Sequence, residues 1–225
     1  MSLRRVIFVS GEHYHLYNRG NSKQKIFLDE ADYDRFLKLL FLCNSKFNIN
    51  FRDVIDATKD VLTFEREETL VDIGAFCLMP NHFHLLIREK DDGNISLFMK
   101  KLLTAYVMYF NKKYERTGSL FEGKFKSEHA GEDNYLKYLF SYVHLNPVKL
   151  IEPKWRTEGV RDKLKAQKYA LNYRYSSYAC LGGEDQKWSK IINTKSFPKY
   201  FLNTAHYKQE IFDWLDSPRK DLGEG

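Results

Sequence analysis

The spacing of apolar and polar side chains along the first part of the chain predicts a strand followed by a helix. An apolar run at residues 6–9 leads into a segment for which we expect a strand over residues 13–18. Asp29 is a good N-cap, and apolar residues recur at helical spacing after it. We therefore expect a core-facing helix from there to about Asn44.

The middle of the chain predicts a β-hairpin. Residues 47–54 fit a strand, and the charged residues 65–68 fit a loop. Two strands are then expected at residues 71–78 and 82–87, joined by a tight turn at Met79-Pro80-Asn81. This hairpin is the most regular β pattern in the sequence.

The pattern returns to helices after the hairpin. A long helix is expected over residues 96–114, and residues 117–126 predict a turn followed by an alternating strand. A second helix begins at Glu132 or Asp133 and is ended by Pro147, because proline disfavours helical geometry in the residue before it. The expected fold class is a mixture of helices and strands.

The composition of the sequence changes beyond Pro153. Residues 156–168 are very polar and residues 169–178 are rich in tyrosine. We therefore expect an α+β core in residues 1–150 and a C-terminal extension in residues 151–225, mostly helical or irregular.

Composition indicates a globular protein that suits a polyanionic partner. Hydrophobic residues make up 43% of the 225 residues, enough to fill a core. Lys and Arg number 36 against 30 Asp and Glu, which gives a net charge of +6. This excess is compatible with a nucleic acid but does not require one.

The positive charge is concentrated between residues 100 and 126, where only Glu115 and Glu122 oppose it. A basic run of this kind is as often a solvated face as a nucleic-acid contact. The cations are Lys100, Lys101, Lys112, Lys113, Arg116, Lys124 and Lys126.

The cysteines and the hydropathy pattern predict a cytoplasmic location. Cys43, Cys77 and Cys180 are widely spaced and odd in number, so they form no disulfide framework. The sequence shows no apolar run of membrane-spanning length and no signal peptide. A reducing cytoplasm is the simplest expectation, with no membrane partner.

Two pairs of histidines have the spacing of a metal site. Residues two apart on a strand share a face, so His82 and His84 project two imidazoles from one side of the predicted hairpin. His13 and His15 have the same spacing, although their flanks are more polar. Spacing alone leaves both pairs open, and leaves open a structural role for either.

A tyrosine and an asparagine share one face of the last core helix. Tyr142 and Asn146 stand four residues apart, one helical turn. A tyrosine with the ordinary pKa of about 10 is a poor nucleophile unless a cation favours its phenolate. The same spacing fits a tyrosine packed in the core and an asparagine that caps the helix before Pro147.

Several motifs in order resemble the IS200-like single-tyrosine transposase family, and most of all its REP-associated branch. The resemblance covers about residues 11–180. The motifs are Pro80-Asn81-His82-Phe83-His84-Leu85-Leu86, Tyr142-Val143-His144-Leu145-Asn146-Pro147-Val148, and the segments 14–20, 118–126 and 175–178.

The resemblance implies a ferredoxin-like fold with an antiparallel sheet and a helix that carries the nucleophile beside it. Carried onto this sequence, it makes His82, His84 and Asn146 the ligands of Mg²⁺ or Mn²⁺, and Tyr142 the nucleophile. It gives His15 a structural or DNA-contacting role. Tyr135 and Tyr138 lie on the same helix, but neither stands four residues before the asparagine.

The resemblance also implies a substrate, an assembly and a location. The expected substrate is single-stranded DNA beside a hairpin, cut and rejoined through a 5′-phosphotyrosine intermediate. Arg19 in the first motif and the seven cations between residues 100 and 126 are candidates for phosphate contacts. A homodimer in the bacterial cytoplasm or nucleoid is expected, and the hairpin edge at residues 83–87 could pair with its copy.

Two other functions remain open at this stage. One is a catalytically idle DNA-binding regulator derived from a transposase, which would need no reactive Tyr142. The other is a metal-dependent phosphodiesterase that uses water as its nucleophile.

Overall fold

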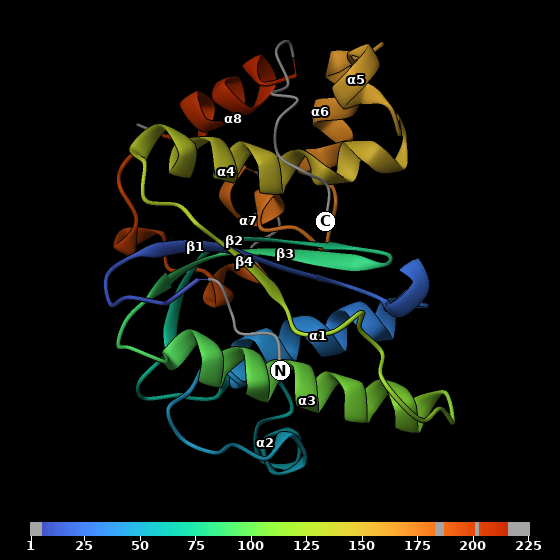
Figure 1. Cartoon of the computed structure of the whole chain (residues 1–225), viewed down its shortest axis with the longest axis vertical. Helices are drawn as coiled ribbons and strands as arrows, with labels where there is room; N and C mark the ends of the chain where they lie inside the picture. The colour runs from blue at the N-terminus through green and yellow to red at the C-terminus, as the bar shows by residue number, and fades with distance from the viewer. Residues whose placement is uncertain (1–5, 183–186, 201–202, 216–225) are drawn as a thin grey trace.

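The computed structural model describes residues 6–182, 187–200 and 203–215 of the chain, and these residues build a sheet between two layers of helices (Figure 1). The sheet has four antiparallel strands in the order β2-β3-β1-β4. This is the order of a ferredoxin-like fold, so the predicted α+β class is confirmed. The strands are β1 (His13–Arg19), β2 (Val71–Met79), β3 (His82–Glu89) and β4 (Lys126–His129).

One face of the sheet is covered by α1 (Glu30–Leu42) and α3 (Asn94–Lys113) (Figure 1). The predicted cap of α1 is confirmed, because the Asp29 side chain accepts a hydrogen bond from the Asp32 amide at 3.0 Å. Phe83 points from β3 into this layer, where its ring packs against Phe36. This face holds the larger apolar core.

The opposite face is covered by α4 (Asp133–Leu145), which carries Tyr142. Leu86 of β3 packs with Leu139 and Val143 of this helix. The α-helix ends before Pro147 as expected, but Asn146 keeps helical backbone angles (φ −53°, ψ −40°), so the expected reason for the helix end is wrong. The chain continues as the short 3₁₀ segment η3 (Asn146–Leu150).

Residues 155–171 and 204–213 of the C-terminal extension pack on the outer side of α4, whereas residues 178–182 lie on its other side, toward the sheet (Figure 1). The helices of the extension bury Trp155, Ala166 and Tyr207 against Leu145 and its neighbours. No helix of the described residues combines the length and apolar character that crossing a bilayer needs. The elements are α5 (Trp155–Glu158), α6 (Lys163–Leu171), α7 (Tyr178–Gly182), α8 (Thr204–Asp213), η4 (Ser189–Ile191) and η5 (Thr194–Ser196); two further 3₁₀ segments, η1 (Asn21–Lys23) and η2 (Val61–Thr63), belong to the first 150 residues.

Two predicted strands differ from the structure. The strand expected at residues 47–54 is wrong: that region leads into α2 (Phe51–Thr58), because the Asn50 side chain caps the Arg52 amide at 3.0 Å and starts a helix. The strand expected within residues 117–126 is shorter and later, and only Lys126–His129 pairs with β1. Gly123, with a φ of 151°, interrupts extended pairing before it.

The expected pairing of a second copy along residues 83–87 is wrong, because β3 lies inside the sheet with β2 on one side and β1 on the other. The outer edge of β2 is also partly covered within the chain. The Ser177 amide donates to the Phe76 carbonyl at 2.9 Å, and the Leu78 amide donates to the Tyr175 carbonyl at 2.9 Å. These bonds satisfy groups that an open edge would leave unpaired.

Candidate active site

Strands β1 and β3 place a group of polar rings on the face that α4 covers. Tyr17 lies opposite His84 in the antiparallel register, and Arg19 lies opposite His82. Because alternate residues of a strand share a face, His15 lies on this face too. Four polar rings therefore meet beneath the helix that bears Tyr142.

The rings of His82 and His84 are neighbours, with centroids 4.9 Å apart. His82 is partly exposed, and its Nδ1 lies 2.7 Å from the amide oxygen of Asn81. Because an amide oxygen only accepts, Nδ1 of His82 is the donor and the ring lone pair lies on Nε2. Neutral imidazoles with this orientation are common metal ligands.

His84 is held by a chain of two further residues, His15 and Glu128. Nε2 of His15 lies 3.0 Å from Nδ1 of His84. Nδ1 of His15 lies 3.8 Å from a carboxylate oxygen of Glu128, an ion-pair distance but too long for a hydrogen bond, so this nitrogen has no hydrogen-bond partner. A carboxylate at that position favours the His15 proton on Nδ1, so Nε2 of His15 accepts from His84. The lone pair of His84 then also lies on Nε2.

Glu128 is itself held in place by two tyrosines. Tyr17 and Tyr135 each donate a hydroxyl hydrogen bond of 3.0 Å to one of its carboxylate oxygens. Interaction with His15 is the main cause that lowers the pKa of the Glu128 carboxyl to about 2. The carboxylate end of the chain is therefore ionised over the whole ordinary pH range.

Burial keeps His84 neutral. Desolvation is the largest cause that lowers the pKa of His84 well below its ordinary value, and the nearby His82 and His15 add to it. Arg156 and Lys149 lower the pKa further through their positive charges. The ring is thus in the form that can offer a lone pair to a metal ion.

Of the three tyrosines on α4, Tyr142 is the one whose ring contacts the histidines. Its ring lies edge-on to His15 at 5.4 Å and to His84 at 5.5 Å between centroids. The Tyr135 hydroxyl is bonded to Glu128, and Tyr138 packs against Trp214 at 4.8 Å. Tyr142 is 6% exposed.

Asn146 stands at the end of α4, where its amide nitrogen donates to the Tyr142 carbonyl at 2.8 Å. Its other side-chain atom, the oxygen Oδ1, is buried and accepts no hydrogen bond. A buried acceptor without a donor carries a desolvation cost unless a ligand uses it. Asn146 therefore both caps the helix and offers an oxygen.

These residues fit a divalent ion. Two imidazole Nε2 atoms and one unused amide oxygen match the mixed nitrogen and oxygen donors that transition metals and Mn²⁺ accept. Among the described residues no three His, Cys, Asp or Glu side chains converge as a ligand group. The assignment of Asn146 as the third ligand stays a prediction.

The side chains of the alternative histidine pair, His13 and His15, have different surroundings in the structure. His15 joins the His84 chain described above, whereas the His13 ring packs against Phe197 at 4.9 Å between centroids. Burial lowers the pKa of His13. The metal assignment to His82 and His84 stays a prediction, with His15 as a support of His84.

The predicted DNA-contacting residues fall on two different layers. Arg19 and Lys126 lie on the site face: Arg19 pairs with Glu122 at 3.1 Å, and the Lys126 ammonium lies 5.8 Å from the Tyr17 ring centroid. Lys124 belongs to the segment before β4.

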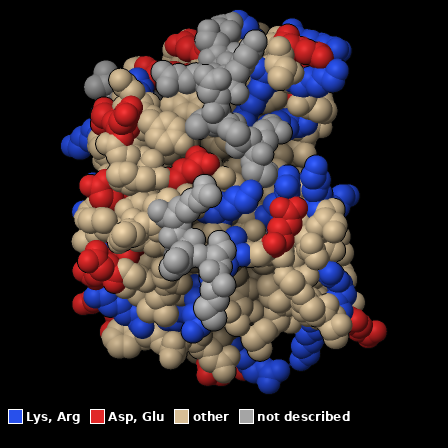
Figure 2. Space-filling model, viewed as in Figure 1, with Lys and Arg blue, Asp and Glu red and all other residues tan. Residues whose placement is uncertain are grey.

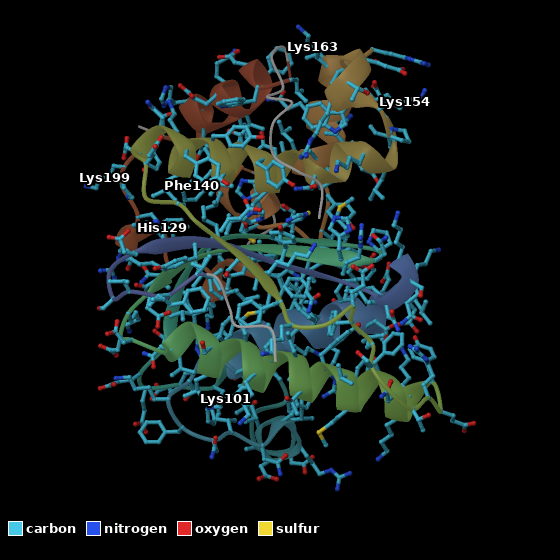
Figure 3. The ribbon with its side chains drawn as sticks, viewed as in Figure 1. Lys101, His129, Phe140, Lys154, Lys163 and Lys199 are labelled. Atoms are coloured by element: carbon cyan, nitrogen blue, oxygen red, sulfur yellow. The ribbon has the colours of Figure 1, made fainter. Side chains whose placement is uncertain are left out.

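The other predicted contacts belong to α3 and the residues after it, across the sheet from α4. Figure 3 shows Lys101 on that side and Phe140 of α4 on the other. The Lys101 ammonium donates to two backbone carbonyls, at 2.8 and 2.6 Å, and Lys113 pairs with Asp32 at 2.8 Å. Lys100, Lys112 and Arg116 share this layer. Figure 2 shows Lys and Arg on both layers of the face in view, so charge alone does not select one.

Arg156, Lys149 and Glu128 were not predicted from the sequence. Arg156 lies on α5 with its guanidinium carbon 4.3 Å from the Tyr142 ring centroid. No spacing in the sequence links these two residues, because the chain turns back through η3 between them. Glu128 could have been found only from the register of β4 against His15.

Comparisons with known proteins match the region that forms this site. A family model described as "Transposase IS200 like" matches residues 8–146, which include the predicted ligands and the predicted nucleophile. The solved structures include a REP-associated tyrosine transposase bound to a REP hairpin, 12% identical, with 80% of this chain and 84% of that chain covered and a TM-score of 0.47. A search of curated proteins finds no match.

Proposed function

The chain belongs to the IS200-like transposase family, and from that premise we propose that it cuts and rejoins single-stranded DNA through a covalent bond to Tyr142. The substrate is the single strand beside a DNA hairpin. The observation that carries the proposal is the position of Tyr142, with its ring against His84 and His15. A tyrosine in this position can meet a phosphate held at the histidine pair.

His82, His84 and Asn146 are the residues that would hold a metal ion. A Mg²⁺ or Mn²⁺ ion held by these residues would supply Lewis-acid polarisation of the scissile phosphate. The chain Glu128–His15–His84 fixes the direction of the His84 lone pair, and Asn81 does the same for His82.

Tyr142 acts as the nucleophile. Its phenolic oxygen gives up a proton and forms a bond to phosphorus, and the bond from phosphorus to the 3′ oxygen breaks. The leaving 3′ oxygen takes up a proton, which leaves a free 3′-OH and a 5′-phosphotyrosine. The new ester conserves the bond energy, so a second 3′-OH can reverse the step and rejoin strands without ATP.

A covalent-adduct experiment tests the proposal. Hairpin DNA with a single-stranded flank is labelled at either end, incubated with the protein and Mn²⁺, and separated on a denaturing gel. A 5′-phosphotyrosine retains the fragment on the 3′ side of the cut, so the 3′ label migrates with the protein and the 5′ label is released. Tyr142→Phe is expected to abolish the adduct, whereas the matched variant Tyr138→Phe retains it.

Other outcomes would favour other functions. An adduct that persists in Tyr142→Phe contradicts the assignment of the nucleophile. Cleavage without any adduct favours a phosphodiesterase that uses water, and binding without cleavage favours an idle regulator. Omission of the metal ion is expected to stop cleavage in every active variant.

A further inference from the structure

A cationic side chain from the C-terminal extension covers the Tyr142 ring. The guanidinium carbon of Arg156 lies 4.3 Å from the ring centroid, a cation–π distance. Arg156 stands on α5, beyond the residues 8–146 that the family model matches. The contact therefore belongs to the extension of this chain.

Arg156 and Tyr142 line the same small hollow between α4 and the extension. Ser141 lines it as well, and its hydroxyl oxygen is buried without a hydrogen-bond partner. The residues around the hollow are Tyr138, Ser141, Tyr142, Leu145, Trp155, Arg156 and Trp214. The hollow thus contains a phenol, a guanidinium and an unsatisfied hydroxyl.

The guanidinium of Arg156 has no counter-ion among the described residues. No carboxylate of the described residues lies at ion-pair distance from its guanidinium, which is only partly exposed. A half-buried guanidinium without a carboxylate is suited to an anionic ligand, and its planar fork matches the geometry of a phosphate.

We propose that Arg156 is a further catalytic residue, which binds the nonbridging oxygens of the scissile phosphate while Tyr142 attacks. This inference rests on the proposed function above. The guanidinium keeps its protons throughout, while the bond from Tyr142 to phosphorus forms and the bond to the 3′ oxygen breaks. Its role is to stabilise the charge on the phosphate oxygens in the transition state.

The test compares a charged and a neutral phosphate in the same protein. Single-turnover adduct formation is measured on hairpin DNA with an ordinary phosphodiester at the cut site, and on the same DNA with a methylphosphonate there. A methylphosphonate lacks the anionic oxygen that a guanidinium would contact. Each Arg156 variant is thus its own control for folding, because a folding defect lowers both rates equally.

Arg156→Ala is expected to slow adduct formation on the phosphodiester by about 10²-fold, the usual effect of losing one preorganised donor. On the methylphosphonate the same variant is expected to lie within about threefold of the wild type, because the anionic oxygen whose charge the guanidinium would neutralise is absent. Arg156→Lys keeps the positive charge but lacks the planar guanidinium that can donate two parallel hydrogen bonds. An intermediate loss of the rate on the phosphodiester is therefore expected. Arg161→Ala, at an exposed arginine nearby, is the matched control and should leave both rates unchanged.

The outcomes separate this inference from the proposed function. Equal losses on the two substrates in Arg156→Ala would mean that Arg156 only supports the Tyr142 ring, and would overturn the inference. An unchanged rate on the phosphodiester would overturn it too. If the wild type forms no adduct on the phosphodiester, the proposed function fails, and the inference falls with it.

Discussion

The two faces of the sheet differ in what their buried side chains do. On the face of α1 and α3, the Phe36 ring packs at a tilt against Phe83 and edge-on to Tyr106, whose hydroxyl donates to a backbone carbonyl. On the face of α4, buried His15 and His84 share a hydrogen bond of 3.0 Å. Strand β3 serves both faces, because its alternate residues point in opposite directions.

The comparison shows how one strand can supply stability and chemistry at once. Buried polar atoms on the α4 face, such as Ser141 Oγ and Asn146 Oδ1, accept no hydrogen bond. Each such atom costs about 1–3 kcal/mol of folding free energy. The apolar packing of the other face offsets that cost, so the site can keep unsatisfied atoms that a ligand would use.

The largest expected effect is on the α4 face and concerns the predicted metal ligands. His84→Ala is expected to reduce adduct formation at least about 10³-fold, beyond the roughly 10–100-fold typical when a residue that supports a ligand is changed. Single-turnover assays across a Mn²⁺ titration measure it. His13→Ala is the matched control and should remain active; the reverse pattern would move the metal site to the other histidine pair.

The second-largest expected effect is on stability, and it comes from Phe83, which points from β3 to the opposite face of the sheet. Phe83→Ala is expected to lower the free energy of unfolding by about 3–5 kcal/mol, because it leaves a cavity in the aromatic core. Denaturant unfolding measures this value. The folded fraction should still form adduct at the wild-type rate, and a selective loss of chemistry would show that the two faces are not separate.

A smaller effect is expected from the carboxylate that supports His84. Glu128→Gln removes the charge that holds the His15 proton on Nδ1, so Mn²⁺ affinity is expected to fall about 10–100-fold. Isothermal titration calorimetry on the DNA-free protein measures it directly. Glu122→Gln, at a carboxylate paired with Arg19, is the matched control. Equal Mn²⁺ affinities in Glu128→Gln and Glu122→Gln would show that the contacts from Glu128 through His15 to His84 do not support metal binding.

The smallest effect is expected from the lysines of α3. If DNA lies against the α4 face, Lys112→Ala should change its affinity by less than about twofold. A uniform loss of affinity, with the slope of log affinity against log salt reduced by about 1, would place DNA on the α3 layer instead. Fluorescence anisotropy over a salt series distinguishes the two cases.

The sequence predicted the parts of the fold that depend on local pattern. The hairpin of residues 71–78 and 82–87 and the cap at Asp29 are confirmed, because each rests on a period or a cap that neighbouring residues provide. The strand expected at residues 47–54 is wrong because Asn50 caps a helix of only 8 residues there. Phe51, Val54 and Ile55 have helical spacing, but the alternation of residues 47–51 precedes them and favoured a strand.

Only those residues of the candidate site that lie within sequence motifs could be predicted. His82, His84, Tyr142 and Asn146 came from spacing and from the family resemblance, and that family is now shown by the match over residues 8–146. Arg156 could not be found in this way, because its contact with Tyr142 depends on the turn of the chain after α4. Glu128 required the register of β4, which the alternation of residues 117–126 did not give.

Identification of the residue that is joined to DNA tests the central claim most directly. The covalent complex is trapped with Mn²⁺, digested with a protease and a nuclease, and the nucleotide-bearing peptide is sequenced by mass spectrometry. We expect the nucleotide on Tyr142, beside the two histidines of the α4 face. A nucleotide on Tyr135, Tyr138 or any other residue would contradict the account.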